Sequence, residues 1–246
     1  MKDNSTWDRQ RPAGKSIAGP NWPARRRRSQ AFTLIELLVV IAKVREKGRI
    51  TEAQREIHAL YNAIAEYHSD TSSYPVSDAV LLQAIAAKSD FTFDMPGIPS
   101  TNNSEVMAIL LNRERYRSGA PTVNLNHAKN KLQKFYLTSI PEADTTNLPG
   151  LGPDLVYRDP WGTPYVISFD LNFDGNCRDA LYEKSSVSKP IAGYDSGLNS
   201  TDPAGNTDDF YYRGGVMIWS LGPNKTADAI HKANEAPNRD NIVSWR

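Results

Sequence analysis

Residues 31–42 read AFTLIELLVVIA and contain the longest apolar run of the chain, Phe32 to Ala42, which Glu36 interrupts. Four consecutive arginines, Arg25 to Arg28, stand shortly before this run. A basic segment followed by about 7–15 apolar residues is the pattern of an export signal. By the positive-inside rule, the arginines stay in the cytoplasm and the following chain is exported.

The segment before the apolar run differs in composition from the rest of the 246-residue chain. Residues 1–31 carry eight Lys or Arg and two Asp, whereas the whole chain has a formal net charge of only +1. This segment is rich in Arg, Pro, Gly and Ser and lacks apolar periodicity, so we expect a basic, disordered leader peptide. The single cysteine, Cys177, excludes an intrachain disulfide scaffold and a multi-thiolate zinc site.

Beyond the apolar run, helical spacing continues to about Ser69. Apolar residues recur every three or four positions, which places them on one stripe of a helix: Ile50, Ala53, Ile57, Leu60, Ile64 and Tyr67. Charged residues occupy the other face. The pattern predicts one long helix over residues 32–75, apolar first and amphipathic later, which stops before Pro75.

The remainder divides into two parts. Residues 76–153 are predicted to be an inserted helical and loop segment, with helices at Ser104–Tyr116 and Asn126–Ser139. Residues 154–246 alternate short β-like runs with Gly, Asn, Asp and Pro clusters, including a polar loop over 184–209, and predict an antiparallel sheet. The expected strands are Leu155–Tyr157, Pro164–Asp170, Ala180–Glu183, Phe210–Arg213 and Gly215–Leu221. The fold class is therefore α+β, a long N-terminal helix packed on a small antiparallel head.

The order of residues around the apolar run resembles the class III signal of type IV pilins and type II secretion pseudopilins. A basic leader precedes a small residue, then Phe32, then an apolar helix with Glu36 at its fifth position. The resemblance implies that prepilin peptidase cuts between Ala31 and Phe32 and methylates the new amino group. A carboxylate among Leu and Ile in a bilayer costs about 2–4 kcal/mol, so Glu36 needs a partner. The resemblance supplies one, the Phe32 amino group of a neighbouring subunit.

Several later segments are similar to the G-type major pseudopilin of type II secretion. These are Tyr74-Pro75, Asp159-Pro160-Trp161-Gly162-Thr163-Pro164-Tyr165, Trp219-Ser220-Leu221-Gly222 and the ending from Asp240 to Trp245. The resemblance implies a structural, pilin-like subunit that forms a homo-oligomeric pseudopilus on an inner-membrane assembly platform and supports protein secretion. Its head would lie in the periplasm. The chain departs from the family in having Ala31 before the cut, charges from Lys43 onward, and an insertion over residues 88–152.

Two alternatives remain open. A type IV pilus subunit for adhesion, motility or DNA uptake would share the same signal and head. An exported calcium-binding surface module is the second alternative. An enzyme is least supported, because the four histidines are scattered and neither an HExxH nor a G-x-S-x-G motif occurs. The arginine run is accounted for as the flank of the export signal, so we expect no nucleic-acid binding.

Two loops are candidates for calcium. Asp170, Asn172, Asp174 and Asn176 place oxygen side chains at positions 1, 3, 5 and 7 of an EF-hand-like loop, with Gly175 at position 6. Position 12 is Leu181, so Asp179 would have to substitute, and an Asp/Asn-rich turn without metal fits equally well. The resemblance to G-type pseudopilins suggests a second loop after Leu221. Its candidate ligands are Asn224, Asp228 and Asp240.

Overall fold

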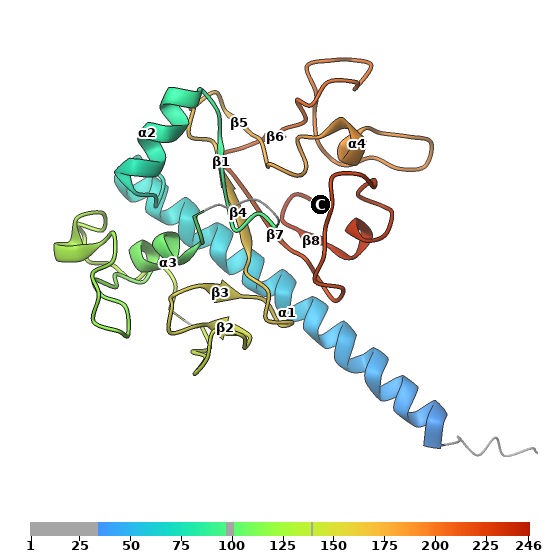
Figure 1. The fold of residues 1–246 in the computed structure, drawn as a ribbon, viewed down its shortest axis with the longest axis horizontal. Helices are drawn as coiled ribbons and strands as arrows, with labels where there is room; N and C mark the ends of the chain where they lie inside the picture. Colours follow the sequence, from blue (N-terminus) through green and yellow to red (C-terminus); the bar gives the residue numbers. More distant parts are fainter. Residues whose placement is uncertain (1–33, 97–100, 139) are drawn as a thin grey trace, which may run out of the picture.

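The computed structural model describes residues 34–96, 101–138 and 140–246. A long helix, α1 (Leu34–Thr71), runs along one side of a compact head and projects beyond it at its N-terminal end (Figure 1). Its buried stripe is the predicted one, with Ala53, Ile57, Leu60, Ile64 and Tyr67 all at most 2% exposed. The helix stops where Ser72 adopts a φ of 54°. The predicted long helix is confirmed; the leader and the predicted cleavage pair, Ala31 and Phe32, lie outside the described residues.

The central sheet has four antiparallel strands in the order β1 (Phe91–Phe93), β4 (Val166–Phe169), β7 (Val216–Ser220) and β8 (Ile242–Val243). Val166 pairs with Trp219, and Phe169 pairs with Val216. Because side chains alternate between the faces of a strand, Ile167 and Ile218 pack with α1, while Met217 and Trp219 pack on the opposite side. The sheet is therefore buried on both faces, and the predicted α+β class is confirmed.

Two short ribbons flank this sheet. One joins β2 (Gly150–Leu151) to β3 (Tyr157–Arg158), and the other joins β5 (Asn176–Cys177) to β6 (Tyr212–Arg213). The strand expected at Ala180–Glu183 is wrong. The Asp179 carboxylate accepts hydrogen bonds from the backbone N–H groups of Leu181 and Tyr182, and these bonds fold that segment into a turn.

The inserted segment also differs from prediction. The helix α2 (Asp78–Ala87) was not expected, and α3 (Ser104–Leu110) is shorter than the predicted Ser104–Tyr116. The predicted helix Asn126–Ser139 is wrong. In the described part of that range the helical structure is limited to a 3₁₀ turn, Leu125–His127. Asn124 and Asn130 are buried, and their side chains bind nearby backbone groups, which compete with helical hydrogen bonds. A short helix, α4 (Ser185–Ser188), interrupts the predicted polar loop, and a 3₁₀ turn, Asn238–Asp240, precedes β8.

Candidate assembly helix and calcium loops

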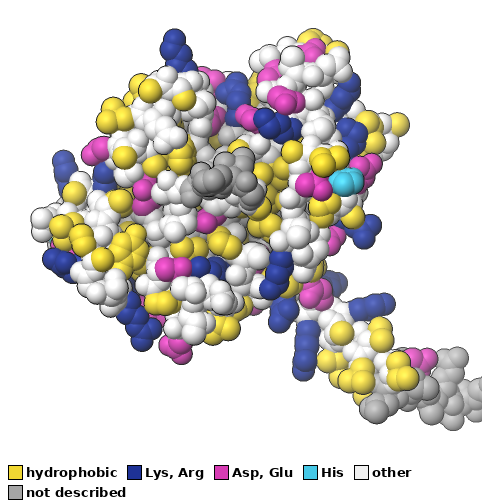
Figure 2. Space-filling model, viewed as in Figure 1, with side chains coloured by type: hydrophobic (Ala, Val, Ile, Leu, Met, Phe, Trp, Pro, Cys, Tyr) yellow, Lys and Arg dark blue, Asp and Glu magenta, His cyan; other side chains and the backbone are white. Residues whose placement is uncertain are grey.

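The N-terminal part of α1 exposes apolar side chains on every side. The exposed fractions are 73% for Ile35, 48% for Leu37, 56% for Leu38, 47% for Val39, 45% for Val40, 39% for Ile41 and 66% for Val44. Figure 2 shows these side chains gathered where the helix has left the head. A helix that is apolar all round is normally buried in a bundle or a membrane. We call residues 35–44 the apolar tip; Glu36 lies in its first turn and is exposed.

The apolar tip is held in a fixed direction by polar contacts between α1 and the head. The indole Nε1 of Trp161 donates a hydrogen bond of 2.9 Å to Glu46 Oε1. Ten residues further along α1, the buried Tyr165 hydroxyl donates a 2.6 Å bond to Glu56 Oε2. Burial raises the pKa of the Glu56 carboxyl, and the Tyr165 hydrogen bond opposes that shift. Neither contact has a local signal in the sequence, because each joins residues more than 100 positions apart.

No helix in the part of the chain that the structure describes is both long enough and apolar enough to cross a membrane.

The first calcium candidate loop is closed by hydrogen bonds of its own. Asp170 Oδ2 accepts a 2.9 Å bond from the Gly175 N–H, and Asn172 Oδ1 accepts one from the Asp174 N–H. The Asp174 carboxylate forms a 3.0 Å ion pair with Arg178 through its Oδ2 atom. Asn176 donates its N–H to Asp174 Oδ1. The structure therefore brings Asp170, Asn172, Asp174 and Asn176 together in one turn.

Asp179, the proposed substitute ligand, is turned into the protein interior. Its side chain is fully buried, and Oδ2 accepts hydrogen bonds from Ser168 Oγ (2.7 Å) and Trp219 Nε1 (2.9 Å). Oδ1 accepts the two backbone bonds that form the following turn. This carboxylate links β4, β7 and the 179–182 turn, a structural role that the sequence did not reveal.

The second candidate loop is organised around Asn238. This buried amide donates to the backbone oxygens of Asp228 (2.8 Å) and His231 (2.7 Å). The Asp228 carboxylate accepts backbone bonds from Ile230 and His231, and these bonds lower its pKa. Asn224 donates to the Pro237 oxygen, and Asp240 lies 3.4 Å from Arg239 Nε. In the described ranges, no group of three or more His, Cys, Asp or Glu side chains is arranged to hold a metal ion. The calcium sites stay a prediction.

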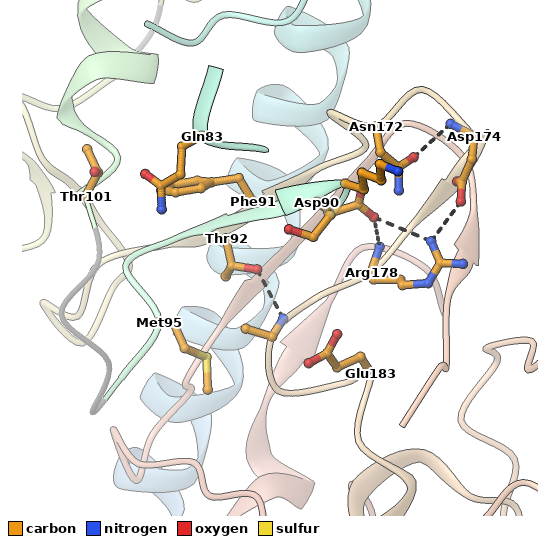
Figure 3. Close-up of a pocket in the computed structure, with 13 residues that line it drawn as sticks. Gln83, Asp90, Phe91, Thr92, Met95, Thr101, Asn172, Asp174, Arg178 and Glu183 are labelled. Carbon is orange, nitrogen blue, oxygen red and sulfur yellow. Dashed lines mark hydrogen bonds and ion pairs between the residues drawn. The ribbon is translucent and has the colours of Figure 1, made fainter. Parts of the chain in front are cut away.

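A cavity of about 540 Å³ lies beside the first loop, between the end of α2, β1 and the turn at Arg178 (Figure 3). Asp90 stands in its wall with only 2% of its side chain exposed. Its Oδ2 accepts a 2.7 Å bond from the Arg178 N–H, whereas Oδ1 is buried without a hydrogen-bond partner among the described residues. Burial raises the pKa of the Asp90 carboxyl to about 7, and the charges of Asp170 and Asp174 add to the shift.

Asp90→Asn is expected to stabilise the protein at pH 8 and to have little effect near pH 4. Because the native pKa is raised from 3.8 to about 7, the native state binds more protons in this interval, and stability is lost as the pH rises through it. Asn does not ionise, so the variant keeps its stability as the pH rises. We expect its free energy of unfolding at pH 8 to exceed that of the wild type by on the order of 2–4 kcal/mol. Urea unfolding at pH 4 and pH 8 measures it. Asp144→Asn, at a side chain that is 95% exposed, is the control; an equal gain in both variants would contradict the assignment.

The N-terminal segment also matches a known protein family. Residues 26–42 match the prokaryotic N-terminal methylation motif, a stretch that includes Ala31, Phe32 and Glu36. No curated protein and no solved structure matches the chain. Proteins of this motif family are structural subunits that prepilin peptidase processes and that assemble with other subunits of their kind. The motif therefore indicates that the chain is a prepilin-processed subunit of the type IV pilin-like kind, anchored in a membrane or displayed in a surface pilus.

Proposed function

We propose that this protein is a structural subunit of a type II secretion pseudopilus. After the cut between Ala31 and Phe32, many copies pack their α1 helices around a common axis and leave the α+β heads outside. An inner-membrane assembly platform would add the subunits, and the heads would lie in the periplasm. The observation that carries the proposal is the apolar tip of α1, which is exposed on all sides beyond the head. Such a surface requires burial against other helices or lipid.

The junction between α1 and the head supports this role. A subunit that transmits force along a filament must hold its helix in a fixed direction. The Glu46–Trp161 and Glu56–Tyr165 hydrogen bonds attach α1 to residues 159–165 at two points along the helix. That segment is itself joined to β7, because the Ser220 hydroxyl donates a 2.6 Å bond to Asp159 Oδ2. The contacts therefore connect the helix to the central sheet.

A type IV pilus subunit is the alternative, since the methylation motif is shared by both filament types. The likeness of residues 159–165 and 219–222 to G-type pseudopilins favours secretion. Deletion of the coding gene in the native host separates the two functions. Retention of secreted proteins in the periplasm supports the pseudopilus, whereas loss of surface filaments with normal secretion supports the pilus.

Calcium remains a prediction for this subunit, and an exported calcium-binding module would depend on it. Binding at the 170–176 loop would raise the melting temperature in millimolar calcium, and Asp174→Asn would abolish that rise. A wild-type melting temperature that calcium does not change would exclude this alternative.

The intact mass of the protein recovered from membranes of its native host tests the processing step. We expect a chain that begins at Phe32 and carries one additional methyl group. A Phe32-initiated mass without the methyl group would mean that cleavage occurs without modification. A mass corresponding to Met1 would contradict processing, and the filament proposal would then lose its basis.

A further inference from the structure

Four cations stand at the end of the apolar tip and directly after it, and the first of them, Lys43, lies within the last two residues of the tip. Lys43, Arg45, Lys47 and Arg49 are all exposed. None of the four forms an ion pair within the residues that the structure describes. The one acidic residue among them, Glu46, is engaged by Trp161. Figure 2 shows the blue side chains at the point where the helix leaves the head. We call these four residues the basic collar.

The basic collar surrounds the helix. Lys43 and Lys47 are four residues apart and share one side, as do Arg45 and Arg49. The two pairs are about 200° apart around the axis, because each residue advances about 100°. The collar occupies about 9 Å of helix length, and it begins about 12 Å from Ile35. Positive charge on two opposite sides of the helix therefore borders the apolar tip.

This succession matches the layers of a bilayer leaflet, in which the phosphates border the acyl chains. Lys and Arg side chains can extend along the helix and place their charges among headgroups while their stems remain in apolar surroundings. Anionic headgroups attract such juxtamembrane cations. We propose that the basic collar binds the anionic phospholipid headgroups of the leaflet that faces the head, while the apolar tip lies among the acyl chains.

A second copy of the chain is a less suitable partner for the collar. The collar of a second copy carries the same sign of charge, and like charges at short distance repel. In a lipid leaflet, each cation instead meets mobile phosphates. The inference rests on the proposed role of the tip as the membrane-facing part of the subunit. It adds that the membrane must be anionic and that the free subunit is held at a defined depth before assembly.

The test uses the full chain and vesicles of phosphatidylcholine, either alone or with 30% phosphatidylglycerol, in a sedimentation assay. The collar variant replaces Lys43, Arg45, Lys47 and Arg49 by Gln. The control variant replaces four exposed cations of the head by Gln, and so has the same net charge: Lys88, Lys131, Arg213 and Lys225. The leader is identical in all three chains, so its contribution cancels.

We expect the wild type to bind anionic vesicles at least about tenfold more strongly than neutral ones, and added salt to weaken the binding. The collar variant should bind anionic vesicles at least about tenfold more weakly than the wild type. Each cation near an anionic surface contributes up to roughly fivefold in binding, so partial contributions from the four are enough for this loss. The control variant should lose less than about threefold, because its charges belong to the head and not to α1. Thermal unfolding by circular dichroism should show the same melting temperature for the wild type and the collar variant.

Four results would overturn the proposal, and they have different meanings. Equal binding of the wild type to neutral and anionic vesicles would agree with insertion of the tip and would contradict headgroup binding by the collar. Equal losses in the collar and control variants would assign the effect to net charge alone. Absence of binding to any vesicle would contradict both headgroup binding by the collar and the membrane-facing role of the tip. A change in the sedimentation of the collar variant without vesicles, with vesicle binding unchanged, would assign the collar to contacts between copies.

Discussion

Glu36→Ala is expected to abolish filament assembly and to leave cleavage after Ala31 intact. Glu36 lies in the first turn of α1, among the exposed apolar side chains of the tip. Once these side chains are buried in a filament or a membrane, an ionised carboxylate there costs about 2–4 kcal/mol unless it has a partner. The proposed partner is the Phe32 amino group of a neighbouring copy, which the cut creates. Its pairing with Glu36 would fix the axial offset between adjacent helices.

The expected loss is about 100-fold in assembled protein, which corresponds to the loss of one charge pair in an apolar environment. Filaments sheared from cells are quantified by electron microscopy and by immunoblot, and intact mass reports processing. Glu52→Ala is the matched control. It makes the same chemical change on the same helix, where the side chain is 49% exposed and lies 4.0 Å from Arg55. Normal filaments from Glu36→Ala, or equal defects in both variants, would contradict the role of Glu36.

The long helix and the central sheet could be predicted because their signals are local. Apolar spacing of three and four residues predicts the buried stripe of α1, and short β-like runs bounded by turn residues predict β4 and β7. The helix α2 also has a local start signal in the sequence. Ser77 caps it by accepting a hydrogen bond from the Val80 N–H, and Asp78 follows in its first turn. The sequence therefore contained a start signal for this helix.

The remaining errors arise where distant residues decide the local structure. The residues Asn126–Ser139 have a helical sequence pattern, but Asn130 donates its side-chain amide to the backbone oxygen of Ile109, 21 positions earlier. Asp179 was considered as a metal ligand, but Trp219 and Ser168 occupy its carboxylate. Contacts of this kind have no sequence pattern, because they join residues that only the folded chain brings together; those of Asp179 depend on the pairing of β4 and β7. The order of residues around Glu36 was recognisable for the opposite reason, because that signal is contiguous.

Asp179→Ala is expected to destabilise the head by about 3–5 kcal/mol. The carboxylate receives four protein donors and is fully buried, as are its partners Ser168 and Trp219. Removal of the acceptor leaves buried donors unsatisfied, at about 1–3 kcal/mol each, and leaves a cavity beside the Trp219 ring. Typical domains have only about 5–15 kcal/mol of stability, so the loss is a large part of the total.

Urea unfolding followed by tryptophan fluorescence measures this loss, because Trp219 itself contacts the site. Asp179→Asn should cost less than the Ala variant, since one side-chain oxygen remains to accept hydrogen bonds. Asp144→Ala, at an exposed position, should change stability by less than about 0.5 kcal/mol. A double-mutant cycle with Trp219→Phe should give a coupling energy above about 1 kcal/mol, because the two residues share a direct bond. If the cycle shows no coupling, the carboxylate does not organise the sheet through the indole. If Asp179→Ala unfolds at the same urea concentration as the wild type, the carboxylate does not stabilise the head. A calcium titration of that variant would then test whether Asp179 acts as a metal ligand.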